Sequence, residues 1–247
     1  MLHYEMNLRS SKKLAIVIPT YKESENITEL VHQILEFIPS ANILIIDDSP
    51  DTNTKEIITE LKRDNVSIIH RASKLGRGSA VLEGMQIQLR LNFDYYLEMD
   101  ADFSHPPEEI LSMLNLIEKE KADLVIASRY VKNSRIINWP TARKIFSLLA
   151  NKLCKYVIKS TLSDYTNGYR IYSKRAMKFT LSHCGKIGDG FILLSEIIVQ
   201  LSKANYKIVE KETVFTNRIR GESSLSAKEV IGAIAGLYKI KRLQRTT

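Results

Sequence analysis

The sequence predicts an α/β protein with a mostly parallel β-sheet covered by helices. Two observations support this fold class. Short apolar runs typical of buried strands alternate with segments of helical periodicity through the first half of the chain. The chain has 247 residues, of which 44% are hydrophobic and 26% charged, as in an ordinary globular protein with a sizeable core.

The first half of the chain shows the alternation clearly. Strands are expected over residues 14–18, 43–46, 66–69, 95–99 and 124–127, with helices between them over residues 27–38, 57–61 and 80–91. A further helix is expected to open at residues 104–109, because early prolines followed by acidic residues are typical of a helix N-terminus.

The pattern changes after Arg129. Helices are expected over residues 139–158, 191–201 and 227–243, and strands over residues 168–172 and 206–216. Neither an internal repeat, nor a low-complexity segment, nor a linker divides the sequence. The prediction is therefore one domain spanning residues 1–247.

Composition makes several classes of protein unlikely candidates. The two cysteines, Cys154 and Cys184, have no CxxC spacing, so neither a disulfide framework nor a zinc site is expected. The first residues lack the pattern of a signal peptide, and the best apolar run, residues 230–238, is too short to span a bilayer. We expect a cytoplasmic protein, or one peripheral at a membrane.

Positive charge is concentrated in one segment. The net charge is +8, and residues 129–163 contain eight Lys or Arg and no Asp or Glu. Such a run is often a solvated face. It also suits a partner that carries phosphate, namely nucleic acid, an anionic membrane or a phosphorylated substrate.

Acidic residues follow two of the expected strands. Asp47 and Asp48 end the second, and Asp100 and Asp102 follow the strand over residues 95–99. Ligands of α/β sheets collect beyond the carboxyl ends of the strands, and Mg²⁺ binds through one or two carboxylates plus substrate phosphates. The alternative is that acidic residues merely end strands. Clustered carboxylates would repel one another without a cation or donors, which favours a cation site.

Several motifs carry a family resemblance. Residues 18–23 (IPTYKE), Asp47-Asp48 and Asp100-Ala101-Asp102 resemble family 2 glycosyltransferases of the GT-A fold. Within that family, the chain resembles the dolichol-phosphate (polyprenyl-phosphate) mannose synthases at residues 74–78, 101–106, 128–130, 164–170 and 218–223. The resemblance covers about residues 14–240. It implies a mixed sheet, a nucleotide-sugar donor, a divalent metal (Mg²⁺ or Mn²⁺) and a lipid-phosphate acceptor.

The resemblance also implies site residues. Donor binding falls to Pro19, Tyr21, Glu23, Ile46, Asp48, Asp100, Ala101, Asp102, Arg129 and Arg218. Metal binding falls to Asp100, Asp102 and Ser104, and the acceptor phosphate to Arg143 and Ser147, which share one face of the expected helix at i, i+4 spacing. Asp102 and Arg129 are the expected catalytic residues. About residues 14–130 would form the nucleotide-sugar half, and about 131–247 the acceptor half.

The implied activity is an inverting transfer of a hexose, mannose from GDP-mannose, to a polyprenyl or dolichyl phosphate. The acceptor phosphate is largely dianionic at neutral pH, so it needs positioning more than a general base. Glu196 and Asp189 are the carboxylates available to act as a base on a hydroxyl acceptor. Two alternatives stay open: transfer to another acceptor, for example from UDP-glucose, and a non-catalytic nucleotide-sugar-binding subunit.

Two departures from the family pattern concern phosphate and nucleotide contacts. The family usually has a Gly between the paired aspartates and Ser-Pro-Asp. Here the loop Asp48-Ser49-Pro50-Asp51 is one residue shorter, which puts its path in question. The family's Lys after Gly-Glu-Ser is Ser224 here, and Arg220 is the candidate to compensate.

Contact with the lipid is expected at the C-terminal amphipathic helix, since no transmembrane helix is predicted. This helix either packs on the core or docks at an anionic membrane surface, with a possible separate membrane-anchor subunit.

Overall fold

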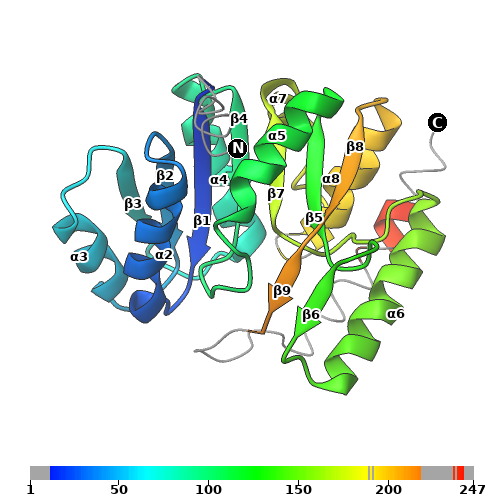
Figure 1. Cartoon of the computed structure of the whole chain (residues 1–247), viewed down its shortest axis with the longest axis horizontal. Helices are drawn as coiled ribbons and strands as arrows, with labels where there is room; N and C mark the ends of the chain where they lie inside the picture. The colour runs from blue at the N-terminus through cyan, green and yellow to red at the C-terminus, as the bar shows by residue number, and fades with distance from the viewer. Residues whose placement is uncertain (1–11, 189, 191, 218–235, 237, 242–247) are drawn as a thin grey trace, which may run out of the picture.

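The computed structural model describes residues 12–188, 190, 192–217, 236 and 238–241. Its centre is a seven-stranded sheet in the order β3-β2-β1-β4-β7-β5-β8 (Figure 1). The strands are β1 (Leu14–Thr20), β2 (Asn42–Asp47), β3 (Val66–His70), β4 (Tyr95–Glu98), β5 (Leu124–Ser128), β7 (Arg170–Ser173) and β8 (Ile208–Glu212).

The sheet is mixed, as expected. β1 pairs in parallel with β2 and with β4, and β5 pairs in parallel with β8. β7 lies antiparallel between β4 and β5, and joins strands from both halves of the chain into one sheet. Its strand-like residues were predicted, but its place in the middle of the sheet was not.

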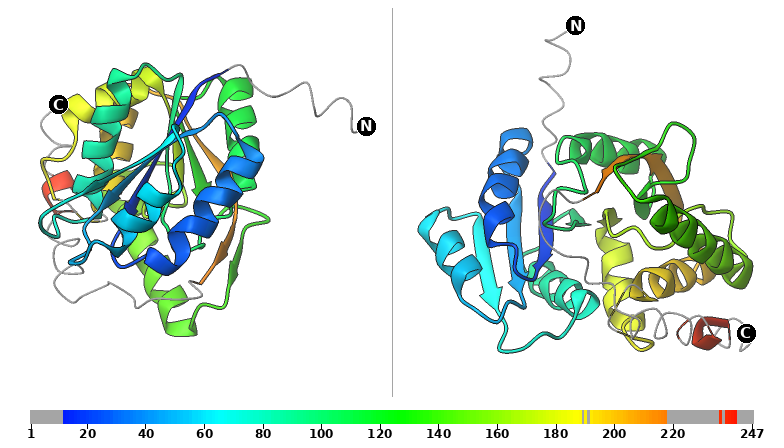
Figure 2. Two further views of the ribbon diagram at one scale, coloured as in Figure 1. Left: turned by 90° about the vertical axis from the view of Figure 1, so that its left-hand side faces the viewer. Right: turned by 90° about the horizontal axis from the view of Figure 1, so that it is seen from below.

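Helices cover both faces of the sheet (Figure 2). One face carries α2 (Ser24–Phe37), α3 (Asn53–Glu60) and α5 (Glu109–Glu120), and the other carries α4 (Arg77–Arg90), α7 (Lys174–His183) and α8 (Ile192–Lys203). α2 shows the cause most clearly: Ile27, Leu30, Val31 and Ile34 recur at helical spacing and are fully buried. Two apolar clusters thus sandwich the sheet.

A close contact fixes α4 against the sheet. A Cβ added to Gly84 would come within 2.6 Å of the Val17 side chain on β1, so the helix approaches the strand only because this residue is glycine. The N-terminus of α4 is thereby held near the carboxyl ends of β1 and β4.

The second half departs from the prediction at residues 206–216. One strand was expected, but the chain breaks at buried Thr213 into β8 and a short β9 (Val214–Thr216). β9 leaves the main sheet and pairs in parallel with β6 (Arg135–Ile137), a strand that was not predicted. Three-residue strands carry too little periodicity to be found from sequence.

The helices of this half also required corrections. α6 spans Thr141–Ile158, starting two residues later than expected because Pro140 is extended (ψ 141°). α7 was not predicted; its N-terminal signal is Ser173, whose hydroxyl accepts a hydrogen bond from the Ala176 amide. In the first half, α5 begins at Glu109, after Pro106 and Pro107.

The expected helix over 227–243 lies largely outside the described residues. Gly236 and residues 238–241 are helical. Ile240 is fully buried in the core, and a Cβ on Gly236 would meet Ile192 of α8 at 2.3 Å. These residues pack on the protein, one of the two alternatives considered for this helix.

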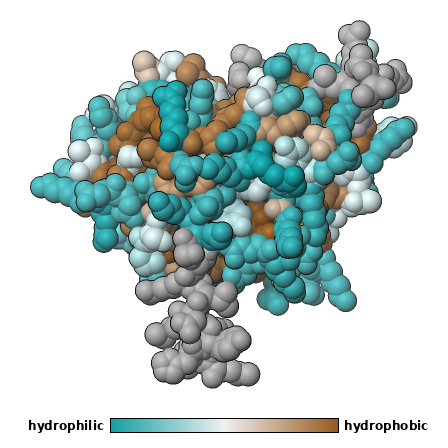
Figure 3. All heavy atoms as spheres, turned by 90° about the horizontal axis from the view of Figure 1, so that it is seen from above, coloured by the Kyte–Doolittle hydropathy of each residue, from teal (hydrophilic) through white to brown (hydrophobic). Residues whose placement is uncertain are grey.

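Among the described residues, no helix is both long and apolar enough to cross a membrane. The end of the molecule at the amino ends of the parallel strands presents a mixture of hydrophilic and apolar side chains (Figure 3). The predicted site lies at the opposite end.

Candidate active site

Asp47, Asp48, Asp100 and Asp102 lie at the carboxyl ends of β2 and β4, on either side of β1, and we call them the acidic edge. Pro19 and Ile46 are register partners on β1 and β2, so two of the expected donor residues lie side by side. This placement follows from the parallel pairing of the three strands.

Asp47 is fully buried and organises the loop after β2. Its carboxylate accepts hydrogen bonds from the hydroxyls of Thr20 (2.8 Å) and Ser49 (2.6 Å), and His70 Nδ1 lies 2.8 Å away. The Ser49 hydroxyl also accepts from the Lys22 amide. Ser49 is not among the positive-φ residues, so the loop closes through this hydroxyl without the family's glycine.

Asp48 is neutralised by Arg71. The guanidinium makes a bidentate pair with the carboxylate, at 2.5 Å (Nε) and 2.7 Å (Nη2). The amides of Leu75 and Gly76 donate to the same carboxylate at 3.0 Å each. In this structure Asp48 therefore fixes the loop that leads into α4.

Asp100 is paired with Arg77, the first residue of α4. Arg77 donates to Asp100 (2.7 Å), to Glu98 (3.0 Å) and to the Gly168 carbonyl (3.1 Å). Burial alone would lower the pKa of Arg77, but the carboxylates of Asp100 and Glu98 raise it well above its usual range. A Cβ on Gly168 would lie 2.0 Å from the guanidinium, so this contact requires glycine.

Asp102 is oriented by Ser104. One carboxylate oxygen accepts from both the Ser104 hydroxyl (2.5 Å) and the Ser104 amide (3.1 Å). Phe103 between them has a positive φ of 57°, which turns the chain back on itself. Ala101 is buried in the apolar cluster beneath.

His105 connects this segment to β5. Its Nδ1 accepts from the Asp100 amide and its Nε2 lies 3.0 Å from Oδ1 of Asn167, whose side-chain amide donates to the Ala127 carbonyl. The ring stacks on Tyr169 at 4.9 Å and is buried. His105 is therefore a structural residue of the site.

Arg129 follows β5 and is paired with Asp164. Its guanidinium donates to both carboxylate oxygens (2.7 and 2.8 Å), and its own amide donates to the same group. Although burial alone would raise the pKa of Asp164, Arg129 lowers it; the carboxylate in turn raises the pKa of Arg129. Arg129 also contacts the hydroxyl of Thr166.

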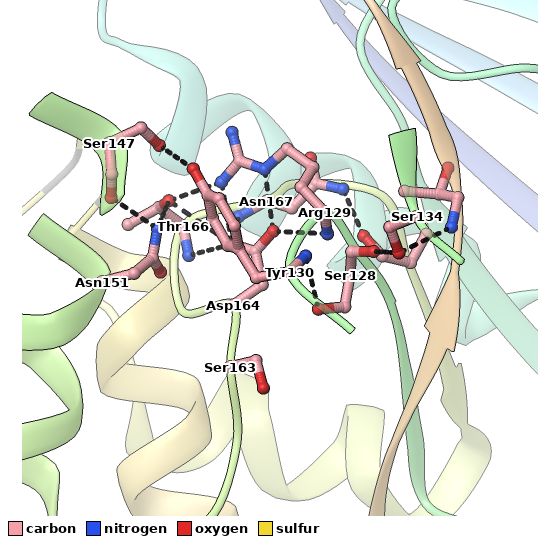
Figure 4. A network of polar contacts seen from close by, with 12 residues as sticks. Ser128, Arg129, Tyr130, Ser134, Ser147, Asn151, Ser163, Asp164, Thr166 and Asn167 are labelled. Carbon is pink, nitrogen blue, oxygen red and sulfur yellow. Dashed lines mark hydrogen bonds and ion pairs between the residues drawn. The ribbon is translucent and has the colours of Figure 1, made fainter. Parts of the chain in front are cut away.

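The two expected acceptor residues lie on the same side of α6. Ser147 Oγ accepts from the Tyr130 hydroxyl at 2.6 Å, and Asn151, one turn further, donates to Thr166 and accepts from the Tyr165 amide (Figure 4). Arg143 donates to Asn217 at 2.9 Å and lies over the Trp139 ring at 4.4 Å.

Tyr21 and Glu23 lie just beyond β1. Tyr21 is 37% exposed, and the ammonium of Lys74 lies 3.8 Å from the centre of its ring. Glu23 accepts from the side chain of Asn26 in the first turn of α2. Tyr21 therefore contacts the β3–α4 segment, while Glu23 lies at the start of α2.

Residues 164–168 connect the acidic and basic sides of the site. Within this loop Asp164 and Thr166 bind Arg129, Asn167 binds His105, and Gly168 binds Arg77. Sequence reasoning quoted this motif but assigned no role to it. It also missed Arg71 and Arg77, each 23 residues from the carboxylate that it pairs with.

The donor atoms at Asp100 and Asp102 fit a hard divalent cation. Both offer carboxylate oxygens, the ligands that Mg²⁺ and Mn²⁺ prefer. In the described part of the chain, no group of three or more His, Cys, Asp or Glu side chains could hold a metal by itself.

Some expected residues cannot be placed. Arg218, Arg220, Ser224 and Asp189 lie outside the described residues. Glu196 on α8 is buried and accepts from the amides of Gly185 and Lys186, so it anchors the α7–α8 loop; burial raises its pKa.

The chain is similar in sequence to known proteins. Residues 15–180 match the family described as glycosyl transferase family 2. The chain is 33% identical over 227 residues to the polyprenol monophosphomannose synthase of Mycolicibacterium smegmatis, covering 90% of this chain and 84% of that protein. It is 32% identical over 230 residues to the undecaprenyl-phosphate mannosyltransferase of Micrococcus luteus, covering 92% and 93%.

Solved structures share the fold. The glucosyl-3-phosphoglycerate synthase of Mycobacterium tuberculosis, in complex with Mn²⁺, uridine-diphosphate and phosphoglyceric acid, superposes with a TM-score of 0.69 at 14% identity, covering 98% of this chain and 82% of that one. Its complex with Mg²⁺ and uridine-diphosphate gives a TM-score of 0.67 at 14% identity, covering 97% and 83%. The expected GT-A fold is confirmed.

Proposed function

Because the chain belongs to glycosyl transferase family 2, we propose that it transfers a hexose, mannose from GDP-mannose, to a polyprenyl or dolichyl phosphate. One observation carries the proposal: the chain is 33% and 32% identical, over nearly its whole length, to two enzymes named for mannose and a polyprenyl lipid. The product would be a lipid-linked monophosphosugar.

The donor is assigned to the acidic edge. The nucleoside would lie beyond β1 and β2, against Pro19, Tyr21, Glu23, Ile46 and Asp48. The diphosphate would lie toward Asp100, Ala101, Asp102, Arg129 and Arg218. Asp100 and Asp102, with Ser104 beside them, would hold Mg²⁺ or Mn²⁺, which as a Lewis acid offsets charge developing on the leaving diphosphate. The two named bacterial synthase complexes contain these metals.

The acceptor phosphate is assigned to α6. Arg143 would supply positive charge and Ser147 a hydroxyl donor. A phosphate monoester has a second pKa of about 6, so its oxygen is already a competent nucleophile at neutral pH. It attacks the anomeric carbon as the bond to the diphosphate breaks on the opposite side, which inverts the configuration. The buried Glu196, engaged with backbone amides, is not needed as a base.

The lipid is expected to meet the protein at α6. Six large apolar side chains of this helix are exposed: Ile145, Phe146, Leu148, Leu149, Leu153 and Tyr156. Lysines at 144, 152, 155 and 159 lie among them. A helix with an exposed apolar face and basic flanks suits the interface of an anionic membrane. Our proposal is that the protein lies peripherally at the cytoplasmic face of a membrane, with α6 as a contact.

The test is a transfer assay. The protein is incubated with Mn²⁺, a polyprenyl phosphate and a panel of labelled nucleotide sugars, and the label is followed into the organic phase. Label from GDP-mannose supports the proposal. Label from UDP-glucose instead would correct the donor. Label only in a water-soluble product would favour a different acceptor, and binding without transfer a non-catalytic subunit.

A further inference from the structure

The first half of α6, which carries Arg143 and Ser147, has no buried residue. Of its eighteen residues only Asn151, Cys154 and Ile158 are buried, and all three lie in its second half. In the first ten residues the described contacts to the body are polar or ring contacts, made by Arg143 and Ser147. The buried side chains of α6 thus lie in its second half, and the hydrogen bond to Ser147 is a contact that ties its first half to the rest of the protein.

Tyr130, after β5, is the hydrogen-bond partner of Ser147 on α6. It immediately follows Arg129, whose guanidinium lies 5.5 Å from the centre of the Tyr130 ring. Arg129 is itself fixed by Asp164. The hydrogen bond from the Tyr130 hydroxyl thus ties Ser147 to the end of β5 (Figure 4). This is the end of the strand to which the donor's phosphates are assigned.

The direction of the hydrogen bond is informative. Tyr130 donates and Ser147 accepts, at 2.6 Å. A serine hydroxyl has one hydrogen to donate and two lone pairs that accept. By occupying a lone pair, Tyr130 leaves the Ser147 hydrogen to a second group, and a phosphate oxygen is a strong acceptor for it.

We infer that Tyr130 is a positioning residue for the acceptor phosphate, acting through Ser147 and holding the first half of α6 at a set distance from Arg129. The inference rests on the proposed function for the identity of the acceptor. The hydrogen bond that ties α6 to the end of β5 does not depend on which acceptor binds.

The test uses Tyr130→Phe, which removes only the hydroxyl, together with Ser147→Ala and the double variant. Loss of one neutral hydrogen bond predicts a rise of about five-fold in the KM for polyprenyl phosphate, with the dissociation constant of GDP-mannose unchanged. The double variant should equal Ser147→Ala alone, because both changes remove the same bond. Tyr96→Phe, which removes a hydroxyl bonded to the Phe93 carbonyl, is the matched control and leaves this KM unchanged.

Hydrogen exchange separates this inference from the proposed function. Amides of residues 143–150 should exchange faster in Tyr130→Phe than in wild type. An unchanged exchange rate, or full additivity in the double variant, overturns the inference. Absence of any transfer by wild type to polyprenyl phosphate overturns the proposed function instead, and the exchange rates then still decide whether Tyr130 ties α6 to the end of β5.

Discussion

Within the acidic edge, Asp48 is paired with Arg71 and Asp100 with Arg77. Clustered carboxylates need compensating positive charge or donors, and the protein itself supplies positive charge through these two arginines. The sequence could place the aspartates, because strand ends in a parallel sheet meet at one edge. It could not reveal the arginines, since the pairing depends on how the loop before α4 folds back.

Gly168 supports a prediction about this pairing. An alanine there would place its Cβ 2.0 Å from the Arg77 guanidinium and displace it from Asp100. We expect Gly168→Ala to lower the stability by about 1–3 kcal/mol, as overpacking does, and to weaken donor binding. Thermal unfolding and GDP-mannose titration measure both. Gly190→Ala is the control, because a Cβ there meets nothing within 4 Å; equal effects of the two changes would refute the pairing.

The Arg129–Asp164 pair predicts a pH dependence. The pKa of Asp164 is lower in the folded protein than in the unfolded chain, where an aspartate titrates at about 3.9. The pair therefore stabilises the fold fully above that value and loses its contribution as the pH falls through the lower, folded pKa. Melting temperatures of wild type and Asp164→Asn should differ most near neutral pH and converge in acid. A constant difference from pH 7 to pH 3 would contradict this.

At the scale of elements, most of the basic segment without acidic residues is the helix α6. The segment from Arg129 to Ser163 includes the whole helix, and its lysines border apolar side chains that the protein leaves uncovered. The helix itself was predictable from its periodicity. Which of its faces packs on the protein was not, because apolar residues occur around most of its circumference and only the tertiary contacts decide.

We predict that α6 carries membrane binding. Leu149→Glu places a charge at a side chain that is 58% exposed and should reduce flotation with anionic liposomes several-fold while leaving the melting temperature nearly unchanged. Leu91→Glu is the matched control, at 59% exposure near the end of α4. Equal flotation of all three proteins would exclude α6. Flotation that requires a second protein would indicate an anchor subunit on this face.

Short elements account for most of the differences between the predicted and observed folds. β6 and β9 have three residues each, and α7 has ten with a mixed polar face. The antiparallel insertion of β7 also escaped prediction, since strand direction is a property of the whole sheet. This insertion matters for the site. Because β7 pairs with both β4 and β5, the 164–168 loop that precedes it lies between the residues that follow these two strands.

At the scale of the whole molecule, the 164–168 loop connects the acidic edge to Arg129 and α6. Gly168 and Asn167 support the acidic edge, while Asp164 and Thr166 support Arg129 and, through Asn151, α6. Asp102 was expected from sequence to bind the donor and the metal, and in the structure Ser104 orients its carboxylate. In the proposed reaction, the donor diphosphate and the acceptor phosphate bind to different sets of residues.

The metal supplies a prediction at the same scale. Chelation by EDTA should abolish transfer and weaken nucleotide binding, with Mn²⁺ or Mg²⁺ restoring both. Asp102→Asn should need far more Mn²⁺ for half-maximal nucleotide binding. Asp51→Asn, a change at an exposed residue within the loop between β2 and α3, should not. Transfer that persists fully in EDTA would contradict a metal-assisted reaction.

The separation of the two sides is tested most directly by one crossed measurement on Asp102→Asn and Arg143→Ala. For each protein the dissociation constant of GDP-mannose with Mn²⁺ and the KM for polyprenyl phosphate are determined. We predict that Asp102→Asn weakens only the donor, and that Arg143→Ala raises only the acceptor KM, by about ten-fold or more, as loss of a charged hydrogen bond does. If either variant shifts both constants equally, the two phosphates do not occupy separate sides, and the account fails.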